Sequence, residues 1–190
     1  MKKKNNQMPD ISVIVCTYNH GSWIERCIRS LLNQNFINKS NFEIILIEDK
    51  STDSTKNVIK NFDDFENIRI YKNKTNLGLP KSLNKAIKLA RGRYVTRVDS
   101  DDYAQRNFLF LTKLYLDMNK EYQAVAVDYL KVDNFEANLS KENCFKKEIA
   151  CGIMYRKECL INIGLYNEKF KMREGHEMIR RFKEKYKVYN

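Results

Sequence analysis

Four short apolar runs, separated by segments with a helical pattern, constrain the fold of this chain more than any other feature. The runs are rich in β-branched residues and occupy residues 11–16, 43–48, 68–71 and 94–98. Continuous apolar runs of this length are typical of strands buried on both faces of a parallel sheet. Each intervening segment has the apolar spacing of an amphipathic helix. The alternation predicts an α/β protein with a doubly wound parallel sheet and right-handed crossovers.

Two local signals mark the ends of these helices. Ser22 and Glu25 have the S-x-x-E spacing of a capping box, which predicts the start of the first helix. Gly92 follows the third helical pattern directly. We expect it to adopt the left-handed conformation that commonly ends a helix.

The second half of the chain has a less regular pattern. It predicts helices over 108–118, 157–163 and 174–186, one or two strands over 124–132 and another strand over 148–155. No linker-like segment separates the halves. We therefore predict a single domain over residues 11–190, preceded by a disordered basic tail over residues 1–10. Within the domain, residues 11–103 form a regular half, and residues 104–190 form a smaller, mixed half.

The composition predicts a globular protein with a basic surplus of charge. Apolar residues make up 43% of the chain, and 35 Lys and Arg against 24 Asp and Glu give a net charge of +11. Such a surplus suits a phosphate-bearing substrate, a membrane surface or a nucleic acid, or it is simply a solvated lysine-rich surface. No concentrated basic and aromatic stripe is present, so we do not expect nucleic-acid binding.

The location and the cysteine chemistry follow from what the sequence lacks. No apolar run approaches the roughly 18 residues that would span a bilayer, and the basic N-terminus lacks an apolar signal-peptide region. We therefore expect a cytoplasmic protein. The five cysteines are scattered without C-x-x-C spacing, which favours neither a zinc site nor a disulfide framework.

The stretch RGRYVTRVDSDDY, residues 91–103, ends in three carboxylates: Asp99, Asp101 and Asp102. If the backbone stays extended, Asp99 and Asp101 point to the same side of the strand. Two carboxylates held this close repel each other unless a positive charge lies between them. Mg²⁺ or Mn²⁺, which bind carboxylates together with substrate phosphates, would supply that charge. The alternative is an acidic turn that caps the following helix.

Three polar segments follow three of the predicted strands directly. They are residues 17–20, 48–53 and 99–102. In open α/β sheets, ligands bind outside the carboxyl ends of the strands, so we expect these segments to converge on one site. The dinucleotide fingerprint G-x-G-x-x-G and the P-loop are absent after the first strand, which disfavours a nicotinamide dehydrogenase and an ordinary NTPase. The pattern favours a cation and a ligand that carries phosphate.

Four blocks of the sequence together resemble family 2 glycosyltransferases with the GT-A fold. The blocks are SVIVCTYNHGSWIERCIRSLLNQ at 12–34, EIILIEDKSTDST at 43–55, NLGLPKSLNKAIKLARGRYVTRVDSDD at 76–102 and GIMYRKECLINIGLYNEKFKMREGHE at 152–177. The resemblance implies a Rossmann-like, mostly parallel sheet flanked by helices. It also implies a metal-dependent, inverting transferase that uses a nucleotide-diphosphate sugar, with a UDP-sugar as the favoured donor. The acceptor would be a surface glycan or a lipid-linked sugar. Residues 11–103 would then bind the donor, and residues 104–190 would lie on the acceptor side.

The resemblance also implies roles for individual donor-side residues. Thr17, Tyr18 and Asn19 would line the base pocket, and Asp49 would hydrogen-bond the base. Asp99, Ser100 and Asp101 match the family's D-x-D motif, in which Asp101 would bind the metal and Asp99 would reach the ribose or share the metal. Asp102 would orient the loop or contact the acceptor.

Other positions depart from the family pattern or have two interpretations. Lys50 stands where the family usually has glycine, so we expect either a negative φ or a strained turn there. Lys81 and Arg97 are candidate phosphate neighbours, and the alternative for each is an ordinary surface charge. His20 is expected near the rim of the nucleotide pocket.

The general base is the position at which this sequence departs most from the family. The family's usual Asp corresponds to Gly175 in the segment Arg173–Glu177. Glu174 and Glu177 are nearly equal candidates to remove the acceptor proton, and His176 is a third. The alternative is an acidic helix N-terminus that complements the helix dipole.

Three further hypotheses stay open at this point. The first is a non-catalytic sugar-nucleotide-binding or partner module with an incomplete acceptor site. The second is nucleotidyl transfer, which the missing glycine-rich triphosphate loop weakens. The third is peripheral contact between an anionic membrane and the basic last helix, which carries Arg180, Arg181, Lys183, Lys185 and Lys187.

Overall fold

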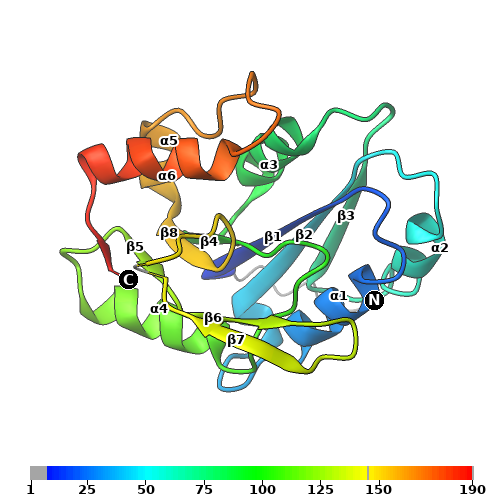
Figure 1. The fold of residues 1–190 in the computed structure, drawn as a ribbon, viewed down its shortest axis with the longest axis horizontal. Coiled ribbons are helices and arrows are strands. Elements are labelled where there is room, and N and C mark those ends of the chain that lie inside the picture. The colour runs from blue at the N-terminus through cyan, green and yellow to red at the C-terminus, as the bar shows by residue number, and fades with distance from the viewer. Residues whose placement is uncertain (1–7, 145, 190) are drawn as a thin grey trace.

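The structure, a computed structural model, describes residues 8–144 and 146–189, and its centre is one seven-stranded sheet (Figure 1). The strand order is β3-β2-β1-β4-β8-β5-β9. The strands are β1 (Ile11–Thr17), β2 (Phe42–Glu48), β3 (Ile68–Lys72), β4 (Tyr94–Arg97), β5 (Ala124–Ala126), β8 (Ile153–Arg156) and β9 (Val188–Tyr189). The predicted α/β class with a mostly parallel sheet is confirmed.

The regular half of the chain supplies the parallel part of the sheet. Strand β1 pairs in parallel with both β2 and β4, and β2 pairs in parallel with β3. Every residue of β2 is buried, as its continuous apolar run predicts. Strand β8 joins the edge of β4 in the antiparallel sense and pairs in the same sense with β5. The second half therefore extends the same sheet with mixed strand directions.

The α-helices of the described residues, six in all, cover the two faces of this sheet; their arrangement can be followed in Figure 1. They are α1 (Ile24–Leu32), α2 (Thr55–Lys60), α3 (Leu79–Leu89), α4 (Phe108–Met118), α5 (Lys157–Asn162) and α6 (Glu174–Lys185). On one face, Val13 and Val15 of β1 belong to a core that includes side chains of α1, α2 and α4. On the other face, Ile14 belongs to a core with α3, α5 and α6. Because side chains alternate along β1, this strand contributes residues to the cores on both faces of the sheet.

Both predicted helix-end signals act differently in the structure. Helix α1 begins at Ile24 with Trp23 as its N-cap and no side-chain capping bond, so the capping box of Ser22 and Glu25 does not form. Helix α3 ends at Leu89, and Ala90 continues in an extended conformation. Gly92 is not left-handed; a Cβ there would lie 2.6 Å from the backbone nitrogen of Ser12. That glycine allows close backbone approach instead of ending a helix.

A separate antiparallel hairpin is the largest feature that the sequence did not predict. Strands β6 (Tyr129–Val132) and β7 (Asn138–Glu142) pair only with each other among the described strands. The segment 124–132 divides into β5 and β6, as one of its two interpretations allowed. A strand over 138–142 was not predicted, and the strand expected over 148–155 is shorter and begins at Ile153.

The ends of the described chain add two facts. Residues 1–7 of the predicted tail lie outside the described residues, whereas Asp10 is held by hydrogen bonds to Asn41 and Tyr94 and by an ion pair with Arg93. Among the helices that the structure describes, none is both long and apolar enough to cross a bilayer.

Candidate functional site at the carboxyl ends of the strands

A cavity of about 280 Å³ lies where β1, β2 and β4 end. Its walls come from the three polar segments that the sequence placed at these strand ends, with additions from helix α3. The lining residues are Cys16, Thr17, Tyr18, His20, Asp49, Leu79, Ser82, Arg97, Asp99, Ser100 and Asp101. The structure thus brings together six of the predicted site residues: Thr17, Tyr18, Asp49, Asp99, Ser100 and Asp101.

Thr17 is the lining residue whose polar group is least satisfied. It is the last residue of β1 and is only 2% exposed. Within the described part of the chain, its hydroxyl has no hydrogen-bond partner. Buried hydroxyls in proteins are nearly always hydrogen-bonded. This oxygen is itself shielded from solvent, so Thr17 lines the cavity through its other atoms.

Asn19 and Lys81 are predicted site residues that do not line the cavity. Asn19 has a left-handed backbone with φ of 56°, and its side-chain oxygen accepts hydrogen bonds from the backbone and the hydroxyl of Thr52. It therefore ties the loop after β1 to the loop after β2. Lys81 is exposed on α3, whereas Lys85 donates a hydrogen bond to Asn73.

The Asp49 carboxylate organises the turn that precedes helix α3. It accepts hydrogen bonds from the side chain of Asn73 at 2.7 Å and from the backbone N–H groups of Leu77 and Gly78, both at 2.9 Å. The next residue, Lys50, has φ of 67°, so the strained alternative predicted for this position is the one observed. A carboxylate has about four acceptor positions, so Asp49 keeps capacity for one more donor.

Arg97 joins two acids that lie far apart in the sequence. Its Nε and Nη2 donate to the two carboxylate oxygens of Asp99 at 2.5 and 3.2 Å, and its Nη1 donates to Glu174 at 3.0 Å. The Arg97 side chain is 9% exposed, so the alternative of an ordinary surface charge does not apply to it. Burial alone would lower the pKa of Arg97, but Asp99 and Glu174 raise it above its ordinary value.

The acidic loop does not continue the strand, because β4 ends at Arg97. The ligating atoms of Asp99, Asp102 and Cys151 lie within 4.8 Å of one another, while Asp101 is exposed and lines the cavity. Burial raises the pKa of Asp102, a hydrogen bond from Cys151 opposes this, and the charges of Asp99 and Asp101 raise it further. The positive charge of Arg97 balances the negative charge of Asp99. The loop as a whole therefore keeps excess negative charge.

The candidate bases lie in different environments at the start of α6. Glu174 is buried against Arg97, and Glu177 forms a bidentate ion pair with Arg181. His176 is exposed. A Cβ on Gly175 would lie 2.1 Å from the Cβ of Ala150, so the present packing leaves no room for a side chain at this position.

Several residues of the site were not singled out from the sequence. Ser82 and Leu79 line the cavity, Asn73 positions Asp49, and Cys151 lies beside the acidic loop. The helical pattern of α3 gave the signal for Ser82, because it places Ser82 on the same buried face as Leu79 and Leu83. His20 was expected near the rim, and its Nδ1 lies 2.6 Å from the Ser100 hydroxyl.

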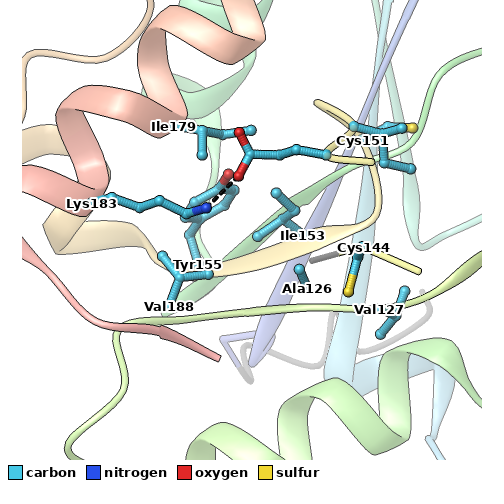
Figure 2. Close-up of a pocket in the computed structure, with 11 residues that line it drawn as sticks. Ala126, Val127, Cys144, Cys151, Ile153, Tyr155, Ile179, Lys183 and Val188 are labelled. Carbon is cyan, nitrogen blue, oxygen red and sulfur yellow. Dashed lines mark hydrogen bonds and ion pairs between the residues drawn. The ribbon is translucent and has the colours of Figure 1, made fainter. Parts of the chain in front are cut away.

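A second, much smaller cavity lies between β5, β8 and α6. Its volume is about 10 Å³, room for about one water molecule. Figure 2 shows Tyr155, Ile153 and Lys183 among the side chains that line it, and Lys183 forms an ion pair with Glu148. The size excludes a nucleotide, so of these two cavities only the one at the strand ends is large enough for such a ligand.

Comparison with known proteins now assigns the chain to a family. The family described as glycosyl transferase family 2 matches residues 12–184. The chain belongs to this family. This family 2 chain is 32% identical over 130 residues to glycosyltransferase GlyG of Streptococcus pneumoniae, covering 67% of the chain and 42% of GlyG. It is 37% identical over 111 residues to the poly(ribitol-phosphate) beta-N-acetylglucosaminyltransferase TarS of Staphylococcus aureus, covering 58% of the chain and 19% of TarS.

Solved structures support the same fold. The crystal structure of residues 1–349 of S. aureus TarS in complex with UDP-GlcNAc matches with a TM-score of 0.78 and 26% identity, covering 90% of this chain and 52% of that one. The mannosyltransferase PcManGT from Pyrobaculum calidifontis, in complex with GDP-Man and Mn²⁺, matches with a TM-score of 0.74 and 17% identity. The match covers 97% of this chain and 55% of the PcManGT chain. The chain spans less than half the length of GlyG and TarS.

Proposed function

We propose that this family 2 domain is a metal-dependent, inverting glycosyltransferase whose donor is a nucleotide-diphosphate sugar, with a UDP-sugar favoured. The observation that carries the proposal is the cavity of about 280 Å³, which unites the three loops that follow β1, β2 and β4. Thr17, Tyr18 and Asp49 would hold the base, with Asn19 supporting their loop. Asp99 and Ser100 would lie at the ribose and diphosphate, and Lys81 would approach the phosphates from α3. Residues 11–103 would then act as the donor half and residues 104–190 as the acceptor half.

The residues of the acidic loop fit a divalent cation, Mg²⁺ or Mn²⁺. Asp99, Asp101 and Asp102 present three carboxylates, and Arg97 compensates only the first of them by direct contact. Hard cations of this kind take carboxylate oxygens together with phosphate oxygens. Asp101 and Asp99 would hold the ion, which when bound would neutralise the charge that builds on the departing diphosphate.

The chain's own residues would then act on the acceptor. Inversion needs a carboxylate that accepts the acceptor's hydroxyl proton, typically worth 10²- to 10⁴-fold in rate. Glu174 and Glu177 are the candidates at the start of α6, each of which would have to exchange an arginine contact for the acceptor. Comparing Glu174→Gln with Glu177→Gln assigns the role, because the variant of the true base loses transfer rate at saturating donor far beyond any change in donor affinity.

The acceptor and the location belong to the same proposal. TarS acts on poly(ribitol-phosphate) by name, and this supports a surface glycan or a lipid-linked sugar as the acceptor class. We place the reaction in the cytoplasm, with peripheral contact to an anionic membrane. Arg180, Arg181 and Lys183 of α6 are engaged in ion pairs, so Lys185 and Lys187 would make that contact. A lack of binding to anionic liposomes at low salt would contradict this contact.

Donor turnover with and without the cation tests the main proposal. We expect UDP-sugar hydrolysis or transfer with Mn²⁺, loss of activity with EDTA, and a loss of at least about 100-fold in Asp101→Ala, equivalent to about 3 kcal/mol. Asp64→Ala, which removes an exposed acid from the loop between α2 and β3, is the matched control and should keep full activity. Equal activity in all of these conditions would overturn the metal role.

One observation favours a second function, a sugar-nucleotide-binding module without transfer activity. The position of the family's usual base is glycine, and Ala150 fills the space beside it. A chain of this kind would bind UDP and Mn²⁺ in calorimetry yet show no turnover on any acceptor. Transfer by the wild-type chain would exclude this function.

A further inference from the structure

We infer that Arg97 is a positioning residue that makes the donor-side acid Asp99 and the α6 acid Glu174 act as one unit. The inference rests on the proposed donor site and gives Arg97 a role beyond balancing the charge of Asp99. All three nitrogens of the Arg97 guanidinium donate hydrogen bonds, two to Asp99 and one to Glu174. Glu174 does not line the cavity, whereas Arg97 and Asp99 do. A guanidinium in its wall therefore connects the cavity to helix α6.

The chemistry of arginine suits this task. The guanidinium is planar, keeps its charge at all working pH values, and offers donors in a rigid fork. One edge of the fork holds both oxygens of Asp99, which fixes the orientation of that carboxylate. The remaining nitrogen, Nη1, lies outside this pair of bonds and donates to Glu174. A lysine has a single ammonium on a flexible stem and cannot hold three oxygens in this arrangement.

The start of α6 depends on this contact because ordinary capping is absent. The residue before the helix, Arg173, has a left-handed φ of 58°, and no side chain caps the first turn. Glu174 is the first residue of the helix and is buried against Arg97. The next residue, Gly175, packs so closely on Ala150 that it admits no Cβ. The start of α6 is thus held in place by the Gly175–Ala150 contact and by the Arg97–Glu174 ion pair. Arg97 of this ion pair also contacts Asp99 in the proposed donor site.

A purely structural ion pair would behave differently, and the chain contains one for comparison. Glu43, which is 1% exposed, accepts hydrogen bonds from Arg69 and Arg91 near the start of β2 and lines neither cavity. Glu43→Gln should lower stability without changing nucleotide affinity. Glu174→Gln, which also neutralises a buried carboxylate bonded to arginine, should weaken binding of UDP with Mn²⁺ about threefold to tenfold.

A double-mutant cycle on UDP affinity tests the coupling. Calorimetry with UDP and Mn²⁺ would compare the wild type, Asp99→Asn, Glu174→Gln and the double variant, each shown to be folded by urea unfolding. We expect the double variant to lose less affinity than the product of the single losses, because both changes disturb one unit. In an Arg97→Lys background the two losses should multiply. Asp99→Asn and Glu43→Gln should multiply in the wild-type background.

The outcomes separate this inference from the proposed function. Multiplying losses for Asp99→Asn and Glu174→Gln in the wild-type background, or an unchanged affinity in Glu174→Gln, would overturn the coupling. UDP binding without transfer would overturn the transferase proposal while the cycle still decides the coupling. Failure of the wild-type chain to bind UDP, with or without Mn²⁺, would overturn both.

Discussion

Two clusters of buried charge lie at opposite ends of the strands and differ in composition. Near the start of β2, one acid, Glu43, is bonded to Ser12, Arg69 and Arg91. At the end of β4, one cation, Arg97, is bonded to two acids, Asp99 and Glu174. The first cluster has more cations than acids and lines no described cavity, whereas the second has more acids than cations and opens onto one. Charge left uncompensated beside a cavity distinguishes the candidate functional site from the structural cluster.

Removal of Arg97 should have the largest effect. Arg97→Ala leaves the buried Glu174 and the partly exposed Asp99 without their partner, and breaking a buried pair of this kind costs about 3 kcal/mol or more. We also expect donor turnover to fall by at least about 100-fold, since Asp99 loses both of its hydrogen bonds from Arg97. Urea unfolding and a UDP-sugar hydrolysis assay measure the two effects. Unchanged turnover in a destabilised protein would make this cluster structural, like the one around Glu43.

Removal of Glu43 should separate stability from activity. Glu43→Ala leaves two guanidinium groups without their acceptor, but Arg69 and Arg91 are partly exposed, so water compensates in part. We expect a loss of about 2–3 kcal/mol in the free energy of unfolding. Donor turnover at a temperature where the variant stays folded should match the wild type. Reduced turnover in the folded variant would show that the two clusters are not independent.

Acid should weaken the Glu43 cluster in a defined direction. Burial alone would raise the pKa of Glu43, but hydrogen bonds from Arg69, Arg91 and Ser12 lower it below its ordinary value of 4.5. A lowered pKa means that the stabilisation is complete above pH 4.5 and is lost as the pH falls below it. Comparison of the acid unfolding of the wild type and Glu43→Gln measures this, and the variant should lose less stability below pH 4.5. Identical acid profiles would contradict it.

Gly175 offers a way to change the functional end of the sheet by design. Gly175→Asp alone forces a side chain against Ala150, and overpacking of this kind costs about 1–3 kcal/mol. Adding Ala150→Gly removes the obstructing methyl group and should restore most of that stability. The pair would place a carboxylate close to Nη1 of Arg97, which lies 3.7 Å from the position of the added Cβ. If the wild type lacks a competent base, the double variant should transfer faster than the wild type. If Glu174 or Glu177 already serves, the rate should not rise.

The parallel part of the fold could be predicted because its signals are local. Strands buried on both faces have continuous apolar runs in the sequence. The carboxyl ends of parallel strands meet at one edge of the sheet, so the convergence of Thr17, Asp49 and Asp99 followed from the order of strands and helices along the chain. The Arg97–Glu174 contact could not be predicted, because it joins residues 77 positions apart whose meeting depends on how α6 packs. The prediction of a left-handed Gly92 was wrong for a related reason. Its sequence context resembles a helix end, but the close approach of the Ser12 backbone is what requires a glycine there. The hairpin of β6 and β7 could not be predicted, because it buries little apolar surface and its polar residues interrupt any apolar run.

The smallest predicted effect is at Lys50, beside Asp49. It tests whether the backbone at the carboxyl ends of the strands is strained. A non-glycine residue in the left-handed region costs about 1–2 kcal/mol, and glycine removes that cost while losing about 0.5–1 kcal/mol through the entropy of the unfolded chain. Lys50→Gly should therefore raise the free energy of unfolding by about 0.5 kcal/mol. The matched control is Lys72→Gly at the end of β3, where φ is not positive, and it should destabilise by about 0.5–1 kcal/mol. Urea unfolding of both variants decides the matter. Equal destabilisation would mean that the φ of 67° at Lys50 carries no strain, and that contacts of the lysine side chain hold the loop in place.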